Sequence, residues 1–182
     1  MRNTLKYLSV YFALSSYGLC DSETPEQFCE KYIDSLRNEG LMAAPRFIHS
    51  EELQRFKSMF ITIFDPNHEF LNQKDILKFF FGADATYDTV ASTTPYNLLS
   101  RVIYLSTPHT KGFILSPKIL GSVTRNEDNS AYVVIQIDSN IAKPEVEILS
   151  LRREGADWKL LLSSEFESML KNKLFINSKE RS

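Results

Sequence analysis

The sequence predicts an α+β domain: amino-terminal helices packed on an antiparallel sheet of about four strands, with a closing helix at the carboxyl end. Apolar residues recur at helical spacing between residues 24 and 105. Between residues 119 and 163 they alternate with polar residues in short runs separated by turns. Helices followed by hairpin-linked strands favour this class, because the helices cover one face of the sheet. A length of 182 residues and a hydrophobic fraction of 43% suit one domain with a sizeable core.

The first helix is expected to begin after Thr24 and to end at Gly40. Thr24 is a suitable N-cap, Pro25 suits the first helical turn, and Gln27 completes a capping box. Gly40 is typical of the residue that follows a helix.

Three further helices are expected before the sheet. The second begins at Ser50 and is broken by the turn at residues 65–67. The third covers about residues 73–81, and the fourth begins at Thr94-Pro95 and runs to about residue 105.

The third helix carries three consecutive phenylalanines, Phe79, Phe80 and Phe81. Consecutive positions point around a helix, so one ring cannot share the core face of the others. The run favours a helix covered on several sides, and a pocket wall or a partner surface is the alternative.

Four strands with alternating apolar residues follow, and turns rich in polar residues separate them. They cover residues 119–125, 131–137, 146–151 and 158–163. Ser164 is expected to cap the closing helix, which carries Phe166, Met169, Leu170 and Leu174, and the polar tail is residues 177–182.

The first twenty residues are expected to be a secretory signal peptide. Arg2 and Lys6 are their only charges, and the uncharged run of residues 7–19 is too short to span a membrane as a stable helix. Export to the periplasm or the medium would leave one α+β domain over residues 21–176, ahead of the polar tail.

Two alternatives to a cleaved signal peptide stay open. A lipid anchor through Cys20 is one, although Leu19 and Tyr17 depart from the usual lipobox residues. The other is a buried amino-terminal helix in place of the signal peptide.

If cleavage removes Cys20, Cys29 is the only cysteine and makes no intramolecular disulfide. We expect Cys29 in the core beside Phe28, with a reactive nucleophile as the alternative.

Composition argues against several classes of function. The formal net charge of −2 and the scattered basic residues give no reason to expect a nucleic-acid partner. His49, His68 and His109 are far apart and show no metal-ligand spacing. No dinucleotide fingerprint, phosphate loop or nucleophile elbow is present, so no cofactor is predicted.

The strand region resembles a known family. Residues 119–125, 131–137 and 146–153, followed by a turn into Asp157-Trp158-Lys159-Leu160, are similar to the final strands of the nuclear-transport-factor-2-like superfamily. That superfamily includes ketosteroid isomerase and SnoaL-like cyclases, and the resemblance spans about residues 24–165. It implies a curved, cone-like sheet around helices, with a pocket at the open end and pairing of two copies through the outer face of the sheet. This chain departs from the pattern in a longer insert at about residues 66–112 and in helix beyond the last strand.

The candidate site residues are few. Asp88, beside Tyr87, and His109 are the candidate catalytic bases, and ordinary solvated positions are the alternative for both. Tyr104, Tyr132 and Trp158 are the candidate ligand-binding residues, expected to line the cavity.

The favoured function is an exported, non-catalytic domain that binds a small apolar ligand or a protein partner in the cell envelope. One alternative is an isomerase- or dehydratase-like enzyme, with an acid or a histidine as base in an apolar cone pocket. The other is a lipid-anchored assembly factor of the envelope, attached through Cys20.

Overall fold

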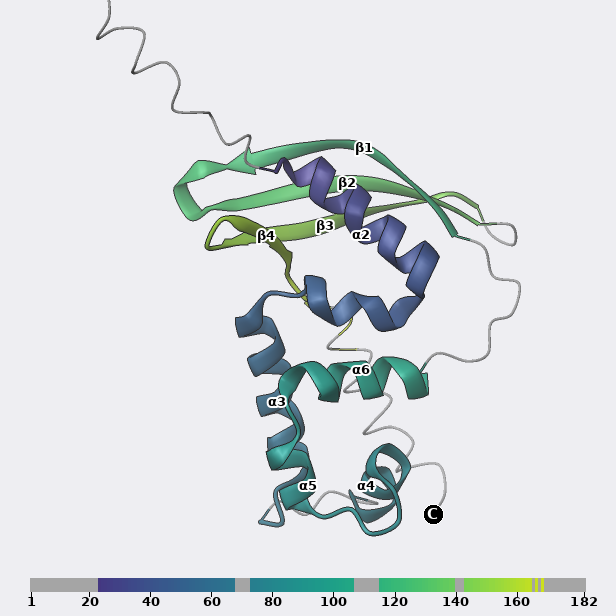
Figure 1. The fold of residues 1–182 in the computed structure, drawn as a ribbon, viewed down its shortest axis with the longest axis vertical. Coiled ribbons are helices and arrows are strands. Elements are labelled where there is room, and N and C mark those ends of the chain that lie inside the picture. Colours follow the sequence, from purple (N-terminus) through teal and green to yellow (C-terminus); the bar gives the residue numbers. More distant parts are fainter. Residues whose placement is uncertain are drawn as a thin grey trace, which may run out of the picture.

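The computed structural model describes residues 23–67, 73–106, 115–139 and 143–164, together with residues 166 and 168. Helices come first along the chain and an antiparallel sheet follows, so the predicted α+β class is confirmed (Figure 1). The helical segments are α2 (Pro25–Glu39), the 3-10 helix η1 (Leu41–Phe47), α3 (Ser50–Phe64), α4 (Gln73–Phe81), α5 (Tyr87–Ser92) and α6 (Pro95–Ser106). The strands are β1 (Leu115–Arg125), β2 (Ser130–Ser139), β3 (Glu145–Glu154) and β4 (Asp157–Leu160), with a one-turn 3-10 helix, η2 (Asn126–Asp128), between β1 and β2.

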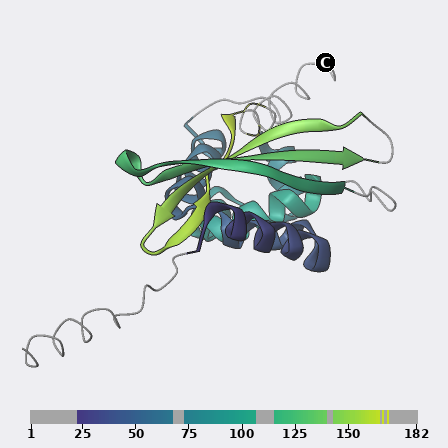
Figure 2. The ribbon, with the colours of Figure 1, turned by 90° about the horizontal axis from the view of Figure 1, so that it is seen from above.

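The sheet is a meander in which each strand pairs with the next along the chain, in the order β1-β2-β3-β4. Alternation along β2 decides which face is buried: Ala131, Val133 and Ile135 point inward, while Tyr132 is exposed. Helix α2 runs along the inner face (Figure 2) and contacts β1 and β2. The predicted alternation of this strand is therefore the alternation between its two faces, and Tyr132 lies on the outer one, not toward a cavity on the inner side.

The start of α2 is tied to the sheet by a polar contact. Thr24 and Gln27 form the expected capping box, since the Thr24 N–H donates to Gln27 Oε1 (2.9 Å) and the Gln27 N–H donates to Thr24 Oγ1 (3.2 Å). In the first turn of the helix, the Glu26 carboxylate accepts a hydrogen bond from the Ser122 hydroxyl of β1. This bond lowers the pKa of Glu26 below its usual value.

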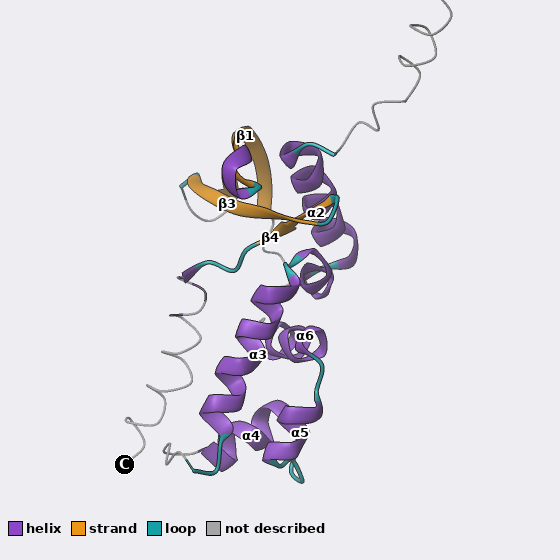
Figure 3. Ribbon diagram, turned by 90° about the vertical axis from the view of Figure 1, so that its left-hand side faces the viewer, coloured by secondary structure: helices purple, strands orange, loops and turns teal. Residues whose placement is uncertain are grey.

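Helices α3, α4, α5 and α6 form a second group, and α4 and α5 lie at the end of the molecule farthest from the sheet (Figures 1 and 3). Its core is built from aromatic rings of α3 and α4, with Phe60 at the centre. The Phe60 ring lies 4.9 Å from the Phe56 ring and 5.9 Å from the Phe80 ring, centre to centre. Leu98, Leu99 and Val102 of α6 complete this core.

The two groups join where the chain passes from η1 into α3. Ile48 forms a parallel bridge with Leu160 of β4, and the His49 N–H donates to the Leu160 carbonyl at 2.9 Å. The next amide, from Ser50, donates to the Glu154 carboxylate at 3.2 Å. Ile48 and His49, which lead into α3, therefore also pair with β4, the last strand of the sheet.

Several details differ from the sequence-based expectation. Helix α3 begins at Ser50 as expected, but its capping residue is His49, whose Nδ1 accepts from the Glu51 N–H at 3.2 Å. Helix η1 and the short helix α5 were not predicted. Strand β4 ends at Leu160, three residues early, because the Leu162 N–H turns to Glu52 of α3 (3.3 Å) and not to a strand.

The predicted leader, the polar tail and most of the closing helix lie outside the described residues. At the start of that helix, the Phe166 N–H donates to Ser163 Oγ (3.1 Å), so Ser163 occupies the capping position expected for Ser164. The Phe166 ring packs on Phe56 of α3 at 6.3 Å between centres. Within the described part of the chain, no helix is both long enough and apolar enough to cross a membrane.

The junction predicts a pH-dependent stability. Hydrogen bonding from Ser50 and the charges of His49 and Lys159 hold the pKa of Glu154 below its ordinary value of 4.5, against the opposing effect of burial. Because the folded pKa is depressed, this contribution is present above pH 4.5 and is lost as the pH falls through the lowered value. We expect Glu154→Gln to lower the free energy of unfolding by about 0.5 kcal/mol at pH 7, measured by urea titration, and the difference from the natural chain to vanish in acid.

Glu127→Gln is the matched control, because Glu127 lies exposed in the turn between β1 and β2 and its replacement removes the same charge. An equal loss in both variants, or a Glu154→Gln effect that persists in acid, would show that the bond to Ser50 contributes nothing.

Candidate functional site

A pocket opens among α3, α4 and the start of α5, and we call it the α4 pocket. Its volume is about 300 Å³. Phe64 and Leu77 are buried at its floor, and Ala85 is half-buried beside them. The described residues that line it are Phe64, Pro66, Gln73, Lys74, Leu77, Lys78, Ala85, Thr86 and Tyr87.

The mouth of the α4 pocket carries positive charge. Lys74 and Lys78 are exposed on α4, one helical turn apart. Neither ammonium group forms an ion pair or a hydrogen bond with another described residue, and no acidic side chain among those residues lines the pocket. The arrangement places an apolar floor beneath two cations that lack protein partners in this part of the chain.

Gln73 holds the wall of the α4 pocket in place. Its side-chain amide donates to the carbonyls of Ile63 and Asp65 at the end of α3. On the far side of the pocket, Thr86 begins α5 with a capping box to Thr89 and thereby positions Tyr87. The Gln73 contacts therefore hold α4 against the end of α3 on one side of the pocket, and the cap at Thr86 fixes the start of α5 on the other side.

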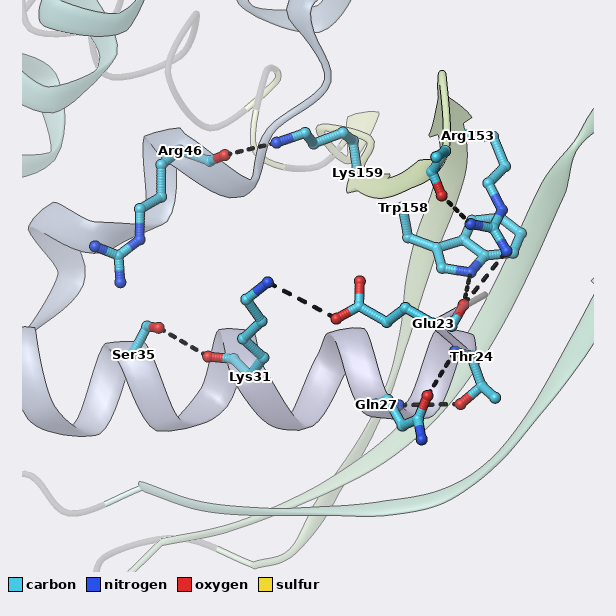
Figure 4. Close-up of polar contacts among 10 residues, drawn as sticks. Glu23, Thr24, Gln27, Lys31, Ser35, Arg46, Arg153, Trp158 and Lys159 are labelled. Carbon is cyan, nitrogen blue, oxygen red and sulfur yellow. Dashed lines mark hydrogen bonds and ion pairs between the residues drawn. The ribbon is translucent and has the colours of Figure 1, made fainter. Parts of the chain in front are cut away.

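A second hollow, the Trp158 cleft, lies between α2, η1 and β4 (Figure 4). Its volume is about 210 Å³, and its described lining residues are Glu23, Phe28, Lys31, Arg46, Phe47, Asp157, Trp158 and Lys159. The Trp158 indole N–H donates to the Glu23 carbonyl at 2.9 Å. The Arg153 guanidinium lies 4.1 Å from the indole ring centre and donates to the same carbonyl at 3.3 Å.

Each cation at the Trp158 cleft has a partner within the protein. Lys31 lies 3.8 Å from a carboxylate oxygen of Glu23, and the Lys159 ammonium donates to the Arg46 carbonyl at 3.1 Å (Figure 4).

The Arg46 guanidinium donates through both terminal nitrogens to the Glu39 carboxylate. This pairing lowers the pKa of Glu39 and raises that of Arg46. The Trp158 cleft is therefore held by contacts that fasten η1 and the start of α2 to β4.

The structure does not bring the candidate ligand-binding residues together. Trp158 is only 3% exposed at its cleft on the inner side of the sheet, whereas Tyr132 is on the outer face. Tyr104 is 65% exposed on α6.

Of the two candidate bases, only Asp88 is among the described residues, and it lines neither pocket. Asp88 is exposed in the first turn of α5 and does not line the α4 pocket, although its neighbour Tyr87 does. His109 lies outside the described residues. His68 does too, and His49 serves as the cap of α3. No group of three or more metal-ligating side chains occurs in the part of the chain that the structure describes.

Cys29 lies in the core, as expected. The thiol is buried between α2 and the sheet, and burial, with a smaller effect of the Glu26 charge, raises its pKa to about 12. A thiol that stays protonated and out of contact with solvent is a poor nucleophile.

Sequence reasoning missed Lys74 and Lys78. A signal was present, because lysines four residues apart bracket Leu77 on a helix that was predicted correctly. The sequence did not indicate that the end of α3 and the start of α5 would form an apolar pocket beside these lysines.

Comparison of this chain with protein-family models, with curated proteins and with solved structures finds no match. The function of the chain is therefore inferred from its own residues.

The buried thiol gives a direct test of the core around α2. In a chain that begins at Asp21, we expect Cys29 to be unreactive toward a chromogenic disulfide reagent at pH 8 in the native state. One thiol should react after unfolding in urea, because unfolding exposes the sulfur and restores an ordinary pKa. Ala156→Cys, in the exposed turn before β4, is the control that should react at once. Rapid native reaction of Cys29 itself would contradict the packing described here.

Proposed function

We propose that this chain is an exported, non-catalytic domain that binds a small apolar ligand in the α4 pocket. The observation that carries the proposal is the apolar floor of Phe64 and Leu77 in a hollow of about 300 Å³. Small-molecule sites are concave and mostly apolar, and typical volumes are about 300–1,000 Å³. The proposed export depends on the basic and then uncharged amino-terminal residues, with a lipid anchor at Cys20 as the alternative.

We also propose membership of the nuclear-transport-factor-2-like superfamily. A helix that crosses the inner face of a four-stranded antiparallel sheet supports this proposal. The α4 pocket, however, is built from helices and lies away from the sheet, whereas the resemblance implies a pocket at the open end of a cone.

Two features favour binding over catalysis. Asp88 is exposed and lines neither the α4 pocket nor the Trp158 cleft. The ionisable side chains that do line the α4 pocket are two lysines and one tyrosine, with no acid–base pair among the described residues. An isomerase- or dehydratase-like reaction needs a base within reach of a bound substrate.

Native mass spectrometry tests the binding function. We expect the chain recovered from the exported fraction to carry a small molecule that is released on denaturation. Ala85→Phe should remove most of that bound population, because the larger ring fills the α4 pocket from its half-buried wall. The same spectra report whether the amino terminus is cleaved, retained or lipidated.

Ala156→Phe adds the same ring to an exposed turn and should leave the bound molecule in place. Two results would contradict the proposal: a natural chain without any bound or bindable apolar molecule, and a bound molecule that Ala85→Phe does not displace. A molecule that leaves chemically altered would favour the enzyme alternative.

The outer face of the sheet supports a second function, pairing of two copies of the chain. Val146 and Ile148 are each 63% exposed there, and Val134 lies opposite Ile148 on the neighbouring strand. Across β1 and β2, exposed Val123 pairs with Tyr132. Adjacent exposed apolar side chains on one sheet face are typical of an interaction surface, and we propose that a second copy covers it.

Light scattering tests the pairing. We expect the natural chain to show twice the mass of one chain, and Ile148→Lys to weaken the association at least tenfold, because a charge would then be buried in the interface. Leu41→Lys is the control, since Leu41 is an exposed apolar residue of η1 away from the sheet face. A natural chain of single mass, or equal behaviour of both variants, would end this proposal.

A further inference from the structure

The α4 pocket differs from the Trp158 cleft in the state of its cations. Lys31, Arg46 and Lys159 at the cleft are all held by protein oxygens. Lys74 and Lys78 at the α4 pocket have no such partner among the described residues. An anion arriving at the cleft would have to compete with internal partners, whereas an anion arriving at the α4 pocket would not.

We propose that the α4 pocket takes an amphiphile with an anionic head group and a short alkyl chain. The chain lies on Phe64 and Leu77, and the head group lies at the mouth between Lys74 and Lys78. This inference rests on the proposed function, because it names the ligand class of the same site.

The position of the two lysines on α4 suits this role. They lie four residues apart on the helix, with Leu77 between them, so one side of α4 presents an apolar floor and a charged margin. A lysine side chain covers apolar surface with its methylene stem and keeps its ammonium in water. The head group can therefore meet both charges at the mouth while the alkyl chain stays below.

The chemistry of lysine sets what is recognised. An ammonium group is a compact point charge on a flexible stem and lacks the planar fork with which arginine selects carboxylates. The mouth of the pocket is therefore expected to select negative charge more than head-group shape. A carboxylate and a phosphate monoester share that chemistry, and the experiment separates them.

The volume limits the alkyl chain. A hollow of about 300 Å³ is at the lower end of the range for small-molecule sites. A single short chain fits this space, and a diacyl lipid does not. The ligand class is therefore a single-chain amphiphile.

Isothermal titration calorimetry on the full chain tests the proposal with three eight-carbon probes: octanoate, octyl phosphate and octan-1-ol. We expect the two anions to bind about threefold to tenfold more tightly than the alcohol at low salt. The preference should shrink as salt is added, because the lysines are exposed. The ratio of the two anions tells which head group the site favours.

Lys74→Gln/Lys78→Gln should remove the preference for the anions and leave the affinity for octanol unchanged. Lys118→Gln/Lys143→Gln removes the same charge from exposed positions in the sheet half and should preserve the preference. All four side chains are exposed, so thermal unfolding should show that both variants fold.

The outcomes distinguish the proposed ligand class from the proposed binding function. Octanol that binds as tightly as the anions, or an anion preference that survives Lys74→Gln/Lys78→Gln, overturns the inference and leaves the binding function standing. Absence of binding by all three probes overturns both.

Discussion

The hydrogen bond from the His49 N–H to the Leu160 carbonyl fixes the point at which the helical group leaves the sheet. Together with the bridge between Ile48 and Leu160, this bond adds a short stretch of chain alongside β4 at the edge of the sheet. The first turn of α3 follows directly. The place at which α3 leaves the sheet is thus fixed here, while the packing of α6 on η1 and the bond from the Leu162 N–H to Glu52 hold the two groups together as well. Helices α4, α5 and α6 pack on α3, so the position of the α4 pocket depends on this junction as well.

The junction is stabilised by more than one backbone bond. His49 is buried, and its Nδ1 lies 3.3 Å from the Arg152 guanidinium in addition to its bond with the Glu51 amide. Arg152 in turn pairs with Glu51, and Glu154 accepts from Ser50. A helix amino terminus is well suited to these carboxylates, because its first N–H groups lack intrahelical partners. The start of α3 and the end of β3 therefore supply hydrogen-bond and ion-pair partners to each other where they meet.

The edge of the sheet and its outer face differ in how well they suit contact with a partner. At the edge of the described sheet, β1 carries Pro117 and Lys118 and an irregular register between Ile119 and Gly121. Proline, lysine and bulges are the features that discourage strand addition at an edge. The exposed apolar residues lie instead on the outer face, so association through side chains is favoured over extension of the sheet.

The sequence by itself determined the α+β class, the start of α2 at its capping box and the alternation of β2. These features depend on residues within about four positions of one another, so local chemistry suffices to predict them. Only the tertiary structure decided which ring of the 79–81 run is buried: Phe80 is, while Phe79 is 63% exposed. It also decided that Lys31 is paired and that Lys74 lacks a partner among the described residues. The physical reason is the same in both cases, because burial and charge pairing depend on which distant segment packs alongside, and no local pattern carries that information.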